Sequence, residues 1–123
     1  MAQDKLLDLG QQVNRVGKYL YRHIDGAYKI KFSPVTCDIY FTMYYQIPQE
    51  KDTFKELNLD INITTYQKKL RINVTELDAN EKTICQIILS PGQIEDLNQL
   101  YRDVYLKIQI AVAKEFSEFD FVY

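Results

Sequence analysis

The sequence predicts an α+β fold, a two-layer sandwich in which an N-terminal helix and a long C-terminal helix cover one face of an antiparallel four- to five-stranded meander sheet. Two patterns predict this fold. Between residues 57 and 89, apolar and polar side chains alternate almost without interruption, which is typical of strands with one buried face. Residues 4–24 and 94–112 instead carry apolar side chains at spacings of three and four, which indicates amphipathic helices. A length of 123 residues suits a single domain, 1–123.

The first helix is predicted over residues 4–24 and ends at Asp25-Gly26. Its apolar stripe consists of Leu6, Leu9, Val13, Val16, Leu20 and Ile24. Gly10 and Gly17 lie beside this stripe, one heptad apart. Because glycine costs a helix about 1 kcal/mol relative to alanine, either another element packs unusually close to these positions or they are tolerated defects.

Five strands are predicted, over residues 28–32, 38–47, 57–66, 68–77 and 82–89. Residues 48–56 are predicted to form a charged loop. The second strand places Tyr40, Thr42 and Tyr44 opposite its apolar residues, a face too aromatic for plain contact with solvent. Tyrosine is enriched at protein interfaces. Tyr40 and Tyr44 are therefore candidate partner-binding residues, and a tyrosine-rich core edge is the alternative.

The C-terminal helix is predicted to begin at Ser90, because Ser90, Pro91 and Gln93 match the preferences of a cap, a first helical position and a capping box. Continued to Ser117, it would contain about 26 residues and measure about 40 Å. A sheet of seven-residue strands measures only about 24 Å. The far end of the helix is therefore expected to extend beyond the sheet.

Residues 112–123 carry large apolar side chains at six of twelve positions, namely Val112, Phe116, Phe119, Phe121, Val122 and Tyr123. Proteins in solution rarely leave such a patch exposed. We expect self-association or stable partner binding through this segment, with Phe116, Phe119, Phe121 and Tyr123 as partner-binding residues. The alternative is that the segment folds back over the Tyr40 and Tyr44 face of its own sheet.

Charge is distributed unevenly along the chain. Residues 1–35 hold six basic and three acidic residues, a net charge of +3, whereas residues 93–123 hold three basic and six acidic residues, a net charge of −3. Arg15, Lys18 and Arg22 form a basic stripe that could contact an acidic partner, including the C-terminal helix of a neighbouring copy. The alternative is that the two helices lie side by side within one fold.

The overall net charge of −2 argues against nucleic acid as a partner. One basic and aromatic cluster, Tyr66, Lys68, Lys69 and Arg71, has the composition of a single-strand binding surface. Lysine and arginine also protect hairpins and edge strands from aggregation. We favour that second interpretation of the cluster.

The sequence contains few of the residues and motifs that are typical of catalytic sites. The chain has one histidine, His23. It lies near the C-terminus of the first predicted helix, where a histidine commonly interacts with the helix dipole. The two cysteines, Cys37 and Cys85, are expected in strands as free thiols, and a disulfide requires those strands to be neighbours. The four glycines are scattered and match no phosphate-binding loop. We expect no catalytic residue, no metal site and no cofactor.

The start of the sequence leads into an amphipathic helix and no run of eighteen apolar residues occurs, so we expect neither secretion nor a membrane partner. The expected location is cytoplasmic, or the virion if the protein is viral.

The order of helix, strands and long helix resembles the topology of adaptor modules such as RWD-type domains, without the turn prolines typical of that group. The sequence therefore predicts a non-catalytic structural or interaction protein, a subunit or adaptor of a larger oligomeric assembly such as a virus-particle ring or connector. A ligand-binding protein or enzyme with a cleft between sheet and helices is the alternative.

Overall fold

The computed structural model describes residues 2–33, 35–48, 52–77 and 82–116 and confirms the predicted α+β fold. Its elements are α1 (Ala2–His23), β1 (Ala27–Ser33), β2 (Asp38–Pro48), β3 (Phe54–Tyr66), β4 (Lys69–Glu76), β5 (Lys82–Leu89), the short 3-10 helix η2 (Pro91–Ile94) and α2 (Leu97–Phe116). The five strands form one antiparallel sheet in the order β1-β2-β3-β4-β5, so each strand pairs with the next one along the chain.

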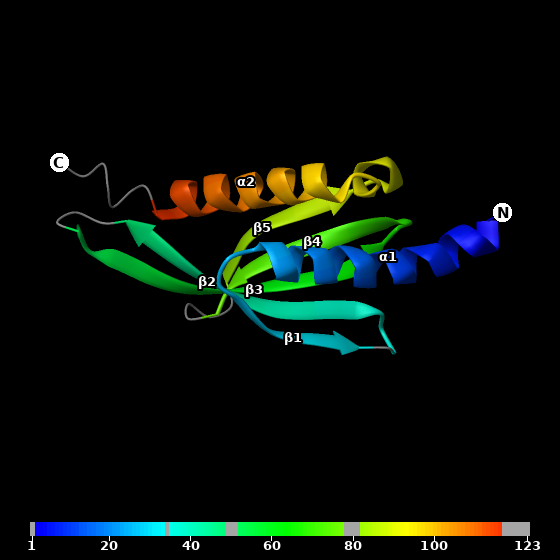
Figure 1. Ribbon diagram of the computed structural model, residues 1–123, viewed down its shortest axis with the longest axis horizontal. Coiled ribbons are helices and arrows are strands. Elements are labelled where there is room, and N and C mark those ends of the chain that lie inside the picture. The colour runs from blue at the N-terminus through cyan, green and yellow to red at the C-terminus, as the bar shows by residue number, and fades with distance from the viewer. Residues whose placement is uncertain (1, 34, 49–51, 78–81, 117–123) are drawn as a thin grey trace.

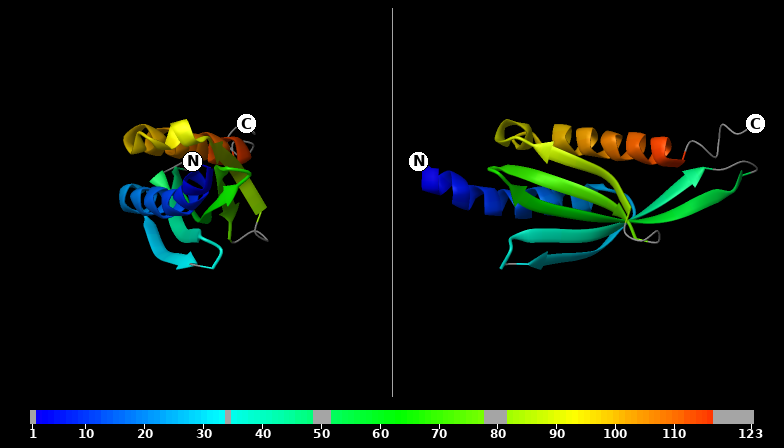
Figure 2. Two further views of the ribbon diagram at one scale, coloured as in Figure 1. Left: turned by 90° about the vertical axis from the view of Figure 1, so that its right-hand side faces the viewer. Right: turned by 180° about the vertical axis from the view of Figure 1, so that it is seen from behind.

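Both helices lie on the same face of the sheet, side by side and pointing in the same direction (Figure 1). The views in Figure 2 show the sheet as one layer and the helices as the other. Helix α1 packs on β1 to β4, whereas α2 packs on β5 at the edge of the sheet and on α1. The opposite face of the sheet is covered by no element of the described chain, and we call it the open face.

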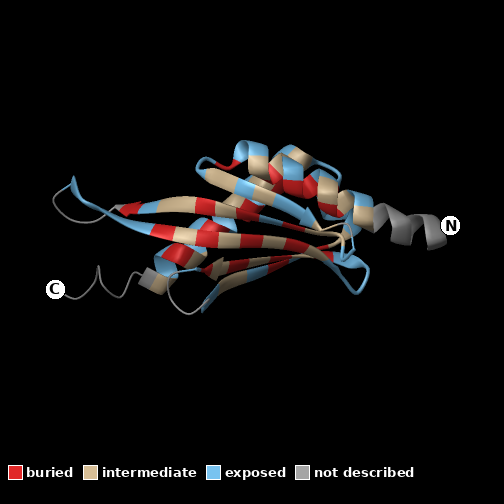
Figure 3. Cartoon of the chain, turned by 90° about the horizontal axis from the view of Figure 1, so that it is seen from below, coloured by how far each residue is buried: buried red, intermediate tan, exposed pale blue. Residues whose placement is uncertain are grey.

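The core lies between the sheet and the helices. Burial alternates along the strands as the sequence pattern requires (Figure 3). Strands β3 and β4 contribute Leu57, Leu59, Ile61, Ile63, Leu70, Ile72 and Val74 to the core, and the helices contribute Val13, Val16, Leu20, Leu100, Val104, Ile108 and Val112. The polar exception on the core-facing side is Glu76, which is only 7% exposed.

The hairpin formed by β2 and β3 is longer than predicted. Ile47 pairs with Lys55 and Pro48 with Phe54, so residues predicted as a charged loop continue both strands. Lys55 and Glu56 are exposed within a strand, and their polar composition therefore resembled that of a loop. Strand β3 has 13 residues, about 43 Å, whereas the 20 residues of α2 measure about 30 Å. Strand β5, on which α2 packs, has 8 residues, about 26 Å, so the helix is longer than the strand that it covers but shorter than the longest strand of the sheet.

The predicted C-terminal helix is divided into two pieces. Gln93 Oε1 accepts a hydrogen bond from the Ser90 N–H at 2.8 Å, as in a capping box, but this cap begins the four-residue helix η2. Asp96 then begins α2, because its Oδ1 accepts a bond from the Gln99 N–H at 3.2 Å and its carbonyl accepts one from the Leu100 N–H at 3.0 Å. The cap predicted at Ser90 therefore begins η2, and the long helix begins only after Asp96.

The two glycines of α1 differ in their surroundings. A Cβ built on Gly17 would lie 2.6 Å from Ile39 Cδ1, whereas one built on Gly10 would lie 3.5 Å from Cys37 Sγ. The expected close approach of another element is therefore confirmed at Gly17, where α1 contacts β2. At Gly10 there is ordinary room for a methyl group.

Both outer strands are irregular. Between Tyr28 and Lys31, β1 advances three residues while β2 advances two, from Thr42 to Tyr40. Lys29, inside this bulge, has a φ of 58°. At the other edge of the sheet, Val74 pairs with Cys85 and Thr75 with Thr83, so Ile84 is an extra residue in β5.

Candidate interaction surfaces

The structure distributes the predicted partner-binding residues over three places. Tyr40 and Tyr44 lie on the open face, and Arg15, Lys18 and Arg22 lie on α1. Phe116 is the last residue of α2, and Phe119, Phe121 and Tyr123 lie outside the described residues. The alternative in which the C-terminal segment covers the open face also concerns residues outside that range. The two described groups, the tyrosines of the open face and the basic residues of α1, lie on opposite faces of the sheet and do not form one site.

The tyrosines of the open face bond to polar neighbours. The Tyr40 hydroxyl donates to Asp38 Oδ2 at 3.0 Å, and the Tyr28 hydroxyl donates to Asn58 Oδ1 at 2.7 Å. The hydrogen bond with Asp38 raises the pKa of Tyr40, and a hydrogen bond with Glu56 raises the pKa of Tyr44. These contacts keep both phenols protonated to higher pH and hold their polar tips against the sheet.

The basic and aromatic cluster at the β3–β4 hairpin is also partly satisfied within the chain. The Arg71 guanidinium lies 4.8 Å from the centre of the Tyr66 ring, a cation–π contact. Gln67 and Lys68 form the tight turn, with φ angles of 47° and 64°. This arrangement agrees with a structural role for the cluster.

Arg15 connects α1 with η2. Its Nη1 donates to Gln12 Oε1 at 2.8 Å and to the Ile94 carbonyl at 3.2 Å, and its Nη2 is 3.5 Å from the Glu95 carbonyl. Nearby, the Tyr19 hydroxyl bonds to Asn98. All three basic residues are exposed, but Arg15 also bonds within the fold through these contacts. The two oppositely charged segments of the chain lie side by side here.

His23 lies in a row of aromatic rings where α1 meets α2. Its ring stacks on Tyr19 with centroids 3.9 Å apart, its Nδ1 is 2.9 Å from the Tyr19 carbonyl, and its centroid is 5.8 Å from that of Tyr101. Tyr101 in turn contacts Tyr105 at 5.8 Å. Within the described ranges, no group of three His, Cys, Asp or Glu side chains is placed to hold a metal ion.

The two cysteines do not form a disulfide with each other. Cys37 lies in the turn between β1 and β2, not in a strand as predicted, and Cys85 lies in β5, three strands away from β2. A disulfide between them is therefore excluded by the order of the strands. Burial raises the pKa of the Cys85 thiol, and the positive charge of Lys107 partly offsets that effect.

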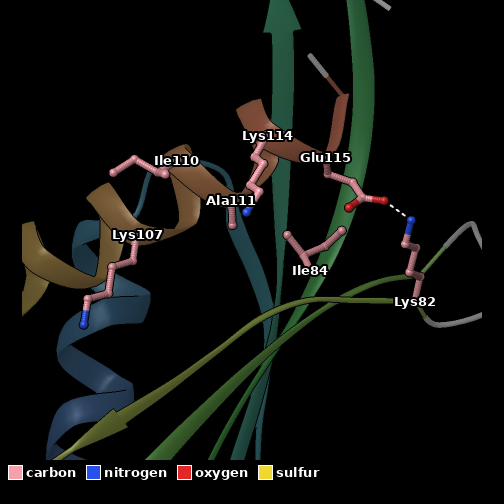
Figure 4. A pocket seen from close by; sticks show the side chains of 7 residues that line it. All are labelled: Lys82, Ile84, Lys107, Ile110, Ala111, Lys114 and Glu115. Atoms are coloured by element: carbon pink, nitrogen blue, oxygen red, sulfur yellow. Dashed lines mark hydrogen bonds and ion pairs between the residues drawn. The ribbon is translucent and has the colours of Figure 1, made fainter. Parts of the chain in front are cut away.

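A concave region of the described chain lies between the outer side of α2 and β5, and we call it the α2–β5 groove. It consists of two hollows of about 730 Å³ and about 270 Å³ that share Lys107 and Ile110. The larger hollow is lined by Lys82, Ile84, Lys107, Ile110, Ala111, Lys114 and Glu115 (Figure 4). The smaller is lined by Ile87, Leu89, Gln93, Leu100, Asp103, Val104, Leu106, Lys107 and Ile110.

Aliphatic side chains form the apolar part of this groove. Leu106 and Ile110, one helical turn apart on α2, are 54% and 58% exposed. The bulge in β5 turns Ile84 toward α2, so this side chain forms part of the groove wall (Figure 4). An ion pair between Lys82 and Glu115 joins the start of β5 to the last turn of α2 at one end of the groove.

The sequence contained a signal for this groove that the helical pattern concealed. The apolar stripe of α2 contains Val104 and Ile108, and Leu106 and Ile110 lie off that stripe, on the side expected to be polar. Large aliphatic residues on the polar side of an amphipathic helix indicate a second contact surface.

Comparison with protein-family models, with curated proteins and with solved structures gave no match. Neither α1 nor α2, the long helices of the described chain, is apolar enough to cross a lipid bilayer.

Proposed function

We propose that the chain is a non-catalytic structural and interaction protein, a subunit of a larger oligomeric assembly in which copies associate through the α2–β5 side. Assemblies of this kind include adaptors in the cytoplasm and the rings and connectors of virus particles. The observation that carries the proposal is the pair of exposed aliphatic side chains, Leu106 and Ile110, beside a hollow. Exposed apolar surface beside a hollow is typical of protein-binding surfaces.

The chemistry of the groove lining supports a binding role over a catalytic one. Apart from Asp103 and Glu115, the titratable groups are lysines, and Glu115 is paired with Lys82. Acid–base catalysis usually depends on a pocket that shifts the pKa values of its acid and base. Aliphatic walls bordered by lysines are better suited to bind a partner protein whose surface is apolar and surrounded by acidic groups.

The test is the native mass of the full chain by sedimentation velocity at several concentrations. We expect a mass that is a multiple of that of one chain. The double variant Leu106→Ser/Ile110→Ser should shift the mass toward a single chain, because it removes apolar area that a partner would bury. Phe32→Ser is the matched control, since Phe32 is an exposed large apolar residue on β1 at the opposite edge of the sheet. A single-chain mass for the unmodified protein at all concentrations would contradict the proposal.

A second candidate function is the binding of a small apolar anion, because the larger hollow has the volume of many ligand sites and three lysines line it. A medium-chain fatty acid such as laurate is a suitable probe. If laurate raises the melting temperature of the full chain while Lys107→Gln abolishes the shift, and the protein sediments as a single chain, ligand binding replaces assembly as the function.

A further inference from the structure

The α2–β5 groove has the length of a short extended segment. Its lining extends along α2 from Leu100 to Glu115, a distance of about 22 Å at the rise of an α-helix. Seven residues in extended conformation span about 23 Å. The groove can therefore accommodate about seven extended residues from end to end.

Residues 117–123, Ser-Glu-Phe-Asp-Phe-Val-Tyr, have a sequence that fits this groove. In an extended segment, successive side chains point to opposite sides. Phe119, Phe121 and Tyr123 would then share one side, and Glu118 and Asp120 would share the other. The segment combines an aromatic side with an acidic one.

We propose that residues 117–123 of one copy occupy the α2–β5 groove of a second copy, an inference that rests on the proposed self-association. The three aromatic rings pack against Leu106, Ile110 and Ile84, which are apolar side chains of the groove. The lining carries three lysines and two carboxylates, a net charge of +1, against −2 on the segment. Apolar contact and opposite charge therefore both favour this occupant.

The position of Asp120 along the segment matches the position of Lys107 along the groove. With Ser117 at the Glu115 end, Asp120 lies about 10 Å farther in, at 3.3 Å per residue. Lys107 is eight residues before Glu115 on α2, a distance of about 12 Å. Lys107, which lines both hollows, is thus the lysine that faces Asp120.

The geometry of the end of α2 favours a second copy over the same chain. Glu115 and its partner Lys82 mark the end of the groove at which α2 ends. The segment would have to reverse direction to enter its own groove, and a reversal takes about four residues. The remaining three residues would span about 10 Å, less than half of the groove. In a two-fold pair whose α2 ends meet, each segment continues straight into the groove of the other copy.

The first experiment compares the native mass of the full chain with that of a chain lacking residues 117–123. We expect the full chain to be dimeric or larger and the shortened chain to be a single chain with an unchanged circular dichroism spectrum. An unchanged multiple mass for the shortened chain would overturn the segment as occupant and leave the proposed self-association in place. A single-chain mass for the full protein would overturn both.

The second experiment is a charge exchange in the full chain. Lys107→Glu and Asp120→Lys should each raise the dissociation constant of the assembly by about tenfold or more, and the double variant should restore it. Arg102→Glu is the control, because it makes the same charge change on α2 at a residue that does not line the groove. Failure of the double variant to recover, or an equal effect of Arg102→Glu, would overturn the pairing of Lys107 with Asp120.

A third measurement separates binding in trans from binding within one chain. A fluorescent peptide of residues 117–123 should bind the shortened chain, as followed by anisotropy, and Ile110→Asp should abolish this binding. Tyr40→Ala, on the open face, should leave it unchanged. If the full chain is monomeric while the shortened chain binds the peptide, the segment occupies its own groove and the proposal for a second copy is wrong.

Discussion

Gly17 of α1 lies directly against Ile39 of β2, so close that a Cβ on the glycine would be within 2.6 to 3.1 Å of three atoms of the isoleucine side chain. Contacts under 3.0 Å require one partner to move. Ile39 is fully buried and belongs to the core, so its side chain has little space to retreat. The absence of a side chain at residue 17 therefore sets the distance between helix and sheet.

Gly17→Ala should destabilise the protein although alanine favours helix formation. Overpacking of this kind costs about 1–3 kcal/mol, more than the gain of about 1 kcal/mol in helix propensity. Gly10→Ala is the matched control: its Cβ would make only ordinary contact with Cys37, and we expect stabilisation of about 0.5–1 kcal/mol. Urea unfolding of both variants measures the difference. Equal stabilisation by both would show that α1 does not approach β2 this closely.

Asp96→Ala should lower the free energy of unfolding by about 1 kcal/mol. The Asp96 side chain accepts a bond from the Gln99 N–H at the start of α2, and alanine leaves that donor without this cap. Glu95→Ala, one residue earlier, serves as the control and should change stability by less than about 0.5 kcal/mol. Chemical denaturation monitored by circular dichroism provides both values, and a larger effect at residue 95 would place the cap elsewhere.

Arg15→Ala should destabilise the fold by about 1 kcal/mol, because the guanidinium donates to Gln12 Oε1 and to the Ile94 carbonyl. Lys18→Ala, on the same helix and exposed, should be nearly neutral. Thermal melts of the two variants at equal protein concentration test this contrast. If Lys18→Ala lowers the native mass while stability is unchanged, the basic stripe predicted from the sequence has a partner-binding role as well.

The reactivity of Cys85 should depend on Lys107. Desolvation raises the pKa of this thiol and Lys107 lowers it, so Lys107→Gln should raise the pKa further and slow alkylation by iodoacetamide at pH 8. The reaction is followed by peptide mass spectrometry, which separates Cys85 from Cys37. Faster alkylation of Cys85 in the variant would contradict the assigned effect of Lys107.

The same shift predicts a dependence of stability on pH. Because the folded thiol of Cys85 has a raised pKa, its contribution to stability is complete below the unfolded value of about 8.5 and is lost as the pH rises above it. The free energy of unfolding of Cys85→Ala should therefore fall less between pH 8 and pH 10 than that of the unmodified chain. Parallel curves for the two proteins would contradict this prediction.

The strands were predictable because period-two alternation reports directly on one-sided burial. Ile61, Ile63, Ile72 and Val74 are fully buried as that pattern requires. The ends of β2 and β3 were not predictable, since Lys55 and Glu56 continue a strand through backbone pairing while their exposed side chains resemble those of a loop. Local composition does not indicate which backbone groups are hydrogen-bonded to a neighbouring strand.

The start of α2 and the groove needed information from distant parts of the chain. Ser90 and Asp96 are both good capping residues, and the fold uses each one for a different helix. Leu106 and Ile110 become part of a groove only because α2 packs on β5 and Ile84 is turned toward it by a bulge. A bulge depends on the pairing register of two strands, which no residue type in β5 announces.

The irregularities in β1 and β5 have a consequence for how copies of this protein can meet. Sheets polymerise when straight outer strands of different molecules pair along their backbones, and a bulge interrupts such pairing. Here the extra residue at Ile84 and the positive φ of Lys29 place one interruption on each side of the sheet. These interruptions make backbone pairing between the outer strands of two molecules less favourable, so any association of copies would have to use side-chain surfaces such as the α2–β5 groove.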